Sequence, residues 1–134
     1  MLIVVDPQSD APVYRQVMEQ VKFLIASGQL QAGDELPSTR TLSAELGVNP
    51  MTISKAYSYL ERDEVLERRP GRPLVVRAFS AEQMRARKVD LLREGLAPAV
   101  TIVRQLEFDP GEALEIFGEM LASAGLPVSR GKEQ

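Results

Sequence analysis

The chain has 134 residues, of which 44% are hydrophobic and 26% are charged, and its formal net charge at pH 7 is −3. This length suits one ordinary domain, or a small domain with an appendage, and argues against a large enzyme fold. Because the chain contains no cysteine and no histidine, disulfides, thiolate chemistry and the usual zinc sites are excluded, and we expect neither a metal nor a cofactor.

The chain begins with "MLIVVDPQSD", which is too short for a signal peptide and lacks a basic start. No stretch approaches the ~18 uninterrupted apolar residues of a membrane span. We therefore expect a cytoplasmic protein without membrane contact.

The first predicted helix lies in the segment "APVYRQVMEQVKFLIASGQL". Pro12 stands near its start, and Gly28 is expected just after its end. Its apolar residues recur at helical spacing and predict one buried stripe. The stripe consists of Tyr14, Val17, Val21, Leu24 and Ile25.

Two short helices follow at close spacing. "TRTLSAEL" predicts a helix of about two turns, with Ser38 as its N-cap and Gly47 at its end. The next helix has Asn49 as its N-cap and Pro50 as its first residue. Only "GVN" separates the two, which is typical of a helix-turn-helix. The second helix of such a pair is the one that enters a groove of DNA.

The two faces of this second helix differ in character. Ile53, Ala56, Tyr57 and Leu60 recur at helical spacing and are predicted to face the core. The opposite face carries small or polar groups without a catalytic constellation. These are Thr52, Ser54, Lys55, Ser58 and Tyr59.

After Leu60 the pattern changes to two short runs of strand-forming residues around a Pro-Gly turn, which predicts a β-hairpin, or wing. The segment "RRPGRPLVVR" in this region carries four arginines and no acid. It is either a basic DNA-binding strip or a solvated strand edge, where arginine discourages edge pairing. The helices and the hairpin together predict a winged helix-turn-helix domain over residues 1–78.

Residues 79–126 are predicted to be wholly helical. "SAEQ" has the spacing of a capping box and starts a helix that Gly95 and Pro98 should bend or break. "DPGE" starts another helix, which should end near Gly125. The tail, residues 127–134, has nothing to bury and is predicted to be mobile. The predicted fold is therefore mainly α with a small β-hairpin wing.

Apolar stripes on these C-terminal helices would bury little by themselves. We expect them to pair with the same segment of a second copy, which makes this region a dimerisation region. A small-molecule effector, where one exists, would lie at the dimer interface, because so small a region leaves little volume for a pocket. The stripes consist of Leu92, Leu96, Val100, Val103, Leu106, Leu114, Phe117 and Leu121.

The segments "PVYRQV" and "GQLQAGDELPSTRTLSAELGVNPMTISKAYSYLE", in this order, resemble the GntR family of bacterial winged-helix transcription regulators. "VNPMTISKAY" joined to a short helical tail resembles the family's YtrA-type subgroup. The resemblance implies a homodimer that binds a palindromic operator in double-stranded DNA through two winged domains. Such a protein is usually a repressor, often of its own operon and of transporter genes.

Residues that contact DNA in the family correspond to Arg40, Asn49, Pro50, Met51, Thr52, Ser54 and Gly71 of this sequence. From charge and position we add Arg72 and Lys55. A helix N-terminus also offers free N–H groups to a phosphate, and small residues there allow close approach.

Other interpretations of these positions stay open. Arg40 could pair with Glu45 on the surface, and Lys55 could be a solvated charge. Two residues depart from the family pattern: Glu64 and Pro73 replace common glycines of the wing, which leaves the wing's conformation open.

Two other functions compete with a DNA-binding regulator. Glu112, Glu115 and Glu119 line one helical face, but without histidine or cysteine they favour a wet surface over an active site. We therefore expect no catalytic residue. The remaining alternative is a winged helix that serves only as a protein-interaction module.

Overall fold

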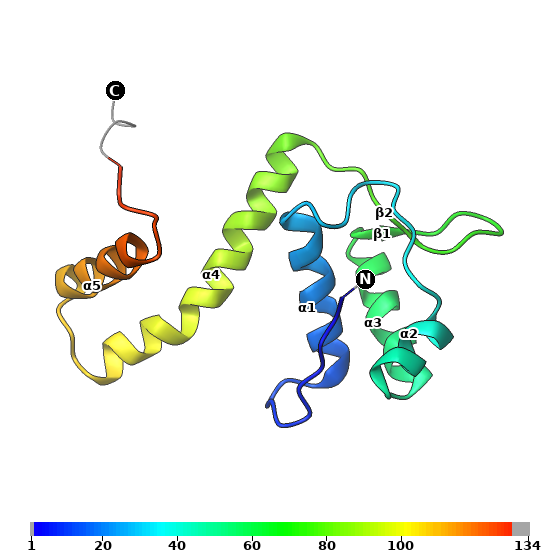
Figure 1. The fold of residues 1–134 in the computed structure, drawn as a ribbon, viewed down its shortest axis with the longest axis horizontal. Helices are drawn as coiled ribbons and strands as arrows, with labels where there is room; N and C mark the ends of the chain where they lie inside the picture. The colour runs from blue at the N-terminus through cyan, green and yellow to red at the C-terminus, as the bar shows by residue number, and fades with distance from the viewer. Residues whose placement is uncertain (1, 130–134) are drawn as a thin grey trace. The chain divides into compact units, whose positions relative to one another are not determined.

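The computed structural model describes residues 2–129, and within them the chain forms five helices and one two-stranded sheet (Figure 1). Contacts divide the chain into two compact units, Met1–Val89 and Asp90–Gln134. The predicted fold class, mainly α with a β-hairpin wing, is confirmed. The helices are α1 (Val13–Ala26), α2 (Thr39–Leu46), α3 (Pro50–Arg62), α4 (Ala81–Gln105) and α5 (Pro110–Ser123), and the strands are β1 (Leu66–Glu67) and β2 (Val75–Val76).

Helices α2 and α3 begin at the predicted caps. The Ser38 hydroxyl accepts a hydrogen bond from the Thr41 N–H at 3.0 Å, and the Asn49 side chain accepts one from the Met51 N–H at 2.8 Å. Gly47 ends α2 with a φ of 67°, a left-handed conformation that costs glycine little. The two ends of α2 and the start of α3 therefore follow from local cap chemistry.

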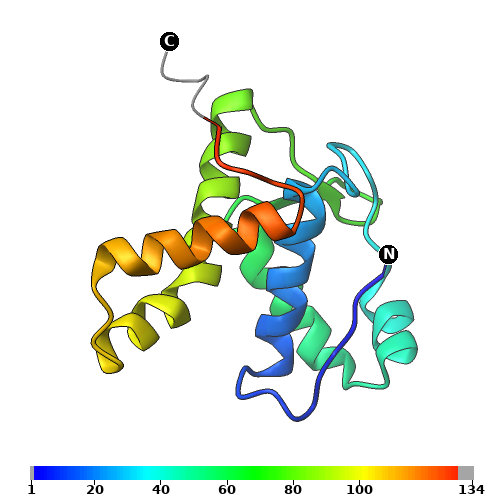
Figure 2. The same cartoon turned by 60° about the vertical axis from the view of Figure 1, so that its left-hand side comes forward.

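The core of the first unit lies where α3 packs against both α1 and α2 (Figures 1 and 2). The four residues predicted for the inner face of α3 are all buried. From α1 they meet Val17, Val21 and Ile25, and from α2 they meet Leu42. The 3.6-residue period thus identified the buried face of α3 and three buried residues of α1, whereas the predicted Tyr14 and Leu24 are half-buried.

The wing is a hairpin with a third segment alongside it. Leu66 pairs with Val76 and Glu67 with Val75 in the antiparallel ladder. The loop before α2 runs on the other side of β2, because the Leu36 N–H donates to the Leu74 carbonyl at 2.8 Å and the Gly33 N–H donates to the Val76 carbonyl at 2.8 Å. This third segment was not predicted.

The two unusual wing residues are accommodated in different ways. Glu64 has a φ of 61°, so a glutamate here adopts the left-handed conformation that favours glycine. Pro73 lies outside the paired residues of β2, so its missing N–H costs no ladder hydrogen bond. Gly71 supplies the positive φ, 67°, that the turn requires.

The N-terminal segment packs on α1, which sequence analysis did not predict. Ile3 is buried in the core of the first unit. The Gln16 side chain accepts from the Asp6 N–H at 2.8 Å and donates to the carbonyls of Asp6 and Ala11 at 3.0 and 2.9 Å. A second glutamine, Gln20, bonds both the N–H and the carbonyl of Val4. Side-chain amides thus take the place of a partner strand.

Helix α4 begins with the predicted capping box: the Gln83 N–H donates to the Ser80 hydroxyl at 3.1 Å, and the Ser80 N–H donates to the Gln83 side chain at 2.8 Å. Of the two outcomes expected at Gly95 and Pro98, a bend or a break, the break is wrong, because α4 continues to Gln105. A single proline removes only one intrahelical hydrogen bond, and the turns on either side remain paired.

Both units contribute to the region predicted as residues 79–126. Phe79 and Met84 pack on the core of the first unit, and the Arg87 guanidinium lies 4.3 Å from the Phe79 ring centroid. Helix α5 begins at its predicted cap, Asp109, and Gly125 follows its end with a φ of 84°. The predicted division into residues 1–78, 79–126 and a mobile tail stays a prediction, and residues 130–134 of that tail lie outside the described residues.

Candidate nucleic-acid interface

The outer face of α3 exposes the side chains predicted to contact DNA. Met51 is 74% exposed at the second residue of the helix, and Ser54 and Lys55 are also exposed. Thr52 is half-buried, and Asn49 and Pro50 at the helix start are exposed. The structure therefore brings this predicted set together on one accessible surface.

The N–H groups at the start of α3 are not free. Pro50 has no N–H, the Met51 N–H bonds the Asn49 side chain, and the Thr52 N–H bonds the Asn49 carbonyl at 2.9 Å. The expectation that free N–H groups here would receive a phosphate is therefore wrong for the first residues of the helix. Side chains remain as the contacts that this face can offer.

Arg40 lies one residue inside the start of α2 and is exposed. Within residues 2–129 it forms no ion pair, so the alternative pairing with Glu45 is not found. Helix α2 packs on α3, and the Tyr57 hydroxyl of α3 donates to the Pro37 carbonyl at 2.8 Å just before α2 begins. The backbone at Arg40 is therefore held in a fixed position relative to α3, the recognition helix of the helix-turn-helix.

Most of the positive charge on the wing is neutralised by the domain's own acids. Three of the four arginines in the basic segment form ion pairs, and Arg72 forms none within the described part of the chain. The Arg72 N–H donates to the Arg69 carbonyl at 3.1 Å, which places its side chain beside the Gly71 turn. The ion pairs are Arg68–Glu61 at 3.3 Å, Arg69–Glu67 at 3.1 Å and Arg77–Glu64 at 3.4 Å.

Lys55 is not simply solvated. Its ammonium lies 4.2 Å from the ring centroid of Tyr14 and 5.9 Å from that of Tyr59. Tyr14 belongs to α1 and was assigned only to the buried stripe, so sequence analysis missed its contact with the recognition helix. Tyr59 was predicted to face outward, but it is half-buried against Tyr14.

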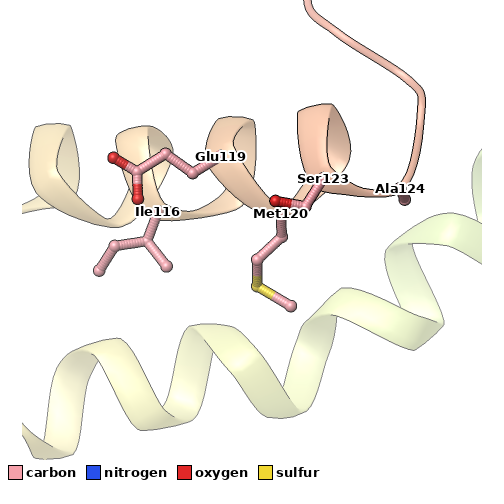
Figure 3. Close-up of a pocket in the computed structure, with 5 residues that line it drawn as sticks. All are labelled: Ile116, Glu119, Met120, Ser123 and Ala124. Atoms are coloured by element: carbon pink, nitrogen blue, oxygen red, sulfur yellow. The ribbon is translucent and has the colours of Figure 1, made fainter.

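Residues 2–129 contain no group of three acidic side chains placed to hold a metal ion, and none of their helices is long and apolar enough to cross a membrane. On α5 an open hollow of about 510 Å³ is lined by Ile116, Glu119, Met120, Ser123 and Ala124, and the side chains of Ile116 and Met120 point to the same side of the helix (Figure 3).

Comparison with known proteins identifies the family of this chain. Residues 13–76 match the family described as "Bacterial regulatory proteins, gntR family". The chain is 33% identical to "HTH-type transcriptional repressor YtrA" of Bacillus subtilis (strain 168), over 98% of each chain. The chain belongs to the GntR family. Its subgroup is the YtrA type, as the sequence predicted.

Solved structures agree with this GntR assignment. The chain is 35% identical to the structure titled "YtrA from Sulfolobus acidocaldarius, a GntR-family transcription factor", with a TM-score of 0.57 over 75% of this chain and 99% of that one. A GntR family transcriptional regulator from Listeria monocytogenes, 23% identical, shares the fold with a TM-score of 0.73 over 86% of this chain and 98% of that one.

This GntR protein is therefore a DNA-binding transcription regulator and not an enzyme, because the family and its relatives are regulators. Family membership also decides against a winged helix used only for protein contact. The individual contact residues, from Arg40 to Arg72, stay predictions.

Proposed function

We propose that this protein is a cytoplasmic, homodimeric repressor that binds a palindromic operator and controls its own operon and transporter genes. The Bacillus subtilis relative YtrA is named a transcriptional repressor, which supports this role, since the match extends over 98% of both chains. Each winged domain would read one half-site through the outer face of α3.

The observation that carries the proposal is the placement of unpaired positive charge. Three of the four wing arginines are paired with acids, whereas Arg40, Lys55 and Arg72 have no acidic partner within the described residues. Arg40 lies on α2, Lys55 on α3 and Arg72 in the turn between β1 and β2, and both α2 and β1 pack on α3. Cationic side chains without acidic partners can bind the phosphates of a DNA duplex, although the net charge of the chain is −3.

Dimerisation is supported by the apolar surface of the second unit. Neither α4 nor α5, both within the described residues, contains a buried residue. A self-complementary pairing with a second copy would cover their exposed apolar side chains. An effector, where one exists, would lie between the two copies. The exposed side chains include Leu92, Val100, Ile102, Leu106, Leu114, Ile116 and Met120.

Binding of the full-length protein to a duplex with the DNA upstream of its own gene tests the proposal. We expect salt-dependent binding that an unlabelled random duplex does not displace. Once the half-sites are mapped, five extra base pairs between them should lower affinity, because they rotate one half-site to the far side of the helix. Full affinity after this insertion would contradict binding by a dimer.

The dimer interface has its own test. Leu114 on α5 is 72% exposed, so Leu114→Glu should leave the fold intact but place a charge in the interface. Val4→Glu changes a similarly exposed residue, 68%, in the first unit and is the control. We expect light scattering to report monomers for Leu114→Glu and dimers for Val4→Glu. A monomeric wild-type protein would contradict the proposed assembly.

A further inference from the structure

The side of α3 that packs on α1 carries an aromatic–cation cluster, formed by Tyr14, Lys55, Tyr59 and Arg62. The two tyrosine rings meet edge to face, with centroids 5.5 Å apart and planes at 61°. The Lys55 ammonium lies over the Tyr14 ring, and the Arg62 guanidinium lies 4.5 Å from the Tyr59 centroid. Tyr14 is the only member that comes from α1.

The two cations of this cluster differ in their charge balance. Arg62 pairs with the Asp63 carboxylate at 3.6 Å, whereas Lys55 has no acidic partner within residues 2–129. An aromatic face attracts a cation without neutralising it and without using its N–H donors. The Tyr14 ring therefore restrains the ammonium while leaving it free to bind an anion.

The position of Lys55 indicates which anion this is. Lys55 lies four residues after Met51, one helical turn further along the same exposed stripe. In a helix-turn-helix the first residues of the recognition helix face the base edges, and the walls of the groove are phosphates. Lys55 lies one helical turn after Met51 and is held toward α1, so we expect its ammonium to lie beside the phosphates that line the groove. Arg40 lies on the α2 side of the same helix.

We propose that Lys55 binds a backbone phosphate of the DNA on the α1 side of α3, and that Tyr14 is a positioning residue that holds the ammonium through its ring. This inference rests on the proposed binding of duplex DNA by the α3 face. It adds α1 to the elements that contribute to affinity, and it predicts a contribution that is independent of base sequence.

The expected changes in affinity follow from the chemistry of the contact. Each neutralised phosphate adds about 0.9 to the steepness of log affinity against log salt. When salt is raised from about 50 to 200 mM, a variant with one phosphate contact fewer should therefore lose roughly 3.5-fold less affinity than the wild type loses. A cation–π contact at an exposed site corresponds to roughly 2- to 5-fold in an equilibrium constant.

The test uses four variants of the full-length protein: Lys55→Gln, Tyr14→Leu, the double variant, and Lys88→Gln as control. Lys88 is an exposed lysine of α4, so its change alters the charge equally on a helix other than α3. Probes are a random-sequence duplex and a duplex from upstream of the protein's own gene. Affinities are measured by fluorescence anisotropy over a range of salt.

We expect Lys55→Gln to weaken binding of both duplexes and to flatten the salt dependence by about 0.9. Tyr14→Leu should weaken binding roughly 2- to 5-fold, but it should have no further effect when Lys55 is already replaced. Lys88→Gln should bind as the wild type does.

Three outcomes would overturn the assignment while leaving DNA binding itself intact. These are wild-type affinity and slope in Lys55→Gln, a full Tyr14→Leu effect in the double variant, and a changed sequence preference in Lys55→Gln, which would mean a base contact. Because Lys55 is exposed, its replacement leaves the fold intact. The salt dependence of the Lys55→Gln variant therefore tests the phosphate contact even if the Tyr14→Leu variant does not fold. A wild-type protein that binds neither duplex would overturn the proposed function as well.

Discussion

Removing the hydroxyl of Tyr57 tests how the start of α2 is tied to the recognition helix. The Tyr57 side chain is 4% exposed, and its hydroxyl donates to the Pro37 carbonyl at 2.8 Å. Pro37 directly precedes Ser38, the N-cap of the helix that carries Arg40. We expect Tyr57→Phe to keep the fold, because the ring that packs in the core is retained.

The expected loss is one hydrogen bond without a cavity. A neutral hydrogen bond contributes ~0.5–1.5 kcal/mol net, and the Pro37 carbonyl, in a half-buried residue, would then depend on water. We therefore expect the free energy of unfolding to fall by about 1 kcal/mol. Tyr59→Phe removes the same atom from a half-buried tyrosine whose hydroxyl makes no hydrogen bond within the described residues, and it should stay within ~0.5 kcal/mol of wild type.

This hydrogen bond also predicts a pH dependence. Burial, and to a smaller degree the Glu45 carboxylate, raise the pKa of the Tyr57 hydroxyl. A group whose pKa is raised on folding contributes its full stability below its unfolded-state pKa, ~10 for tyrosine, and loses it as the pH rises through the folded-state value. The stability advantage of wild type over Tyr57→Phe should therefore shrink above about pH 10.

Urea unfolding followed by circular dichroism measures both effects, with all proteins at one concentration because dimerisation contributes to stability. The reasoning would be refuted if Tyr57→Phe were as stable as wild type, or if Tyr59→Phe lost as much. An advantage that stayed constant above about pH 10 would show that folding does not raise the pKa of Tyr57.

Three further substitutions probe the predicted interface and the wing. Arg40→Ala should weaken operator binding by ~1–3 kcal/mol with unchanged urea stability, and wild-type affinity at fixed salt would rule out the contact. Arg72→Ala should weaken all sequences alike and flatten the salt slope by about one unit, whereas an unchanged slope would make it a plain surface charge. Glu64→Gly should raise the free energy of unfolding by ~0.5–1 kcal/mol, because glycine relieves the strain of the left-handed backbone at this position and this gain exceeds its entropy cost. The ion pair of Glu64 with Arg77 is exposed, so its loss should cost little. A less stable Glu64→Gly protein would show that the pair with Arg77 matters more.

The sequence by itself determined most of the winged helix-turn-helix. The bounds of α2 and the start of α3 depend on Ser38, Gly47 and Asn49, whose cap interactions lie within a few residues of one another. The buried face of α3 follows from a period of 3.6 residues. The GntR resemblance depends on residues of this same segment, so family and fold could be predicted together.

Pro98 shows what a local rule leaves open. A bend or a break is expected at a proline in a helix interior, and α4 continues through Pro98 without a break. The rule describes the cost of one lost hydrogen bond, and it does not say whether the many intact hydrogen bonds on either side outweigh that cost.

The tertiary structure decided which charges and rings meet. Arg68 and Arg77 read as parts of a basic strip, but folding places them beside Glu61 and Glu64 and leaves Arg72 as the wing arginine without an acidic partner in the described chain. Lys55 meets Tyr14 only because α1 packs across α3. Such contacts join residues of different elements, so they depend on how the helices and the wing pack, and no local pattern encodes that geometry.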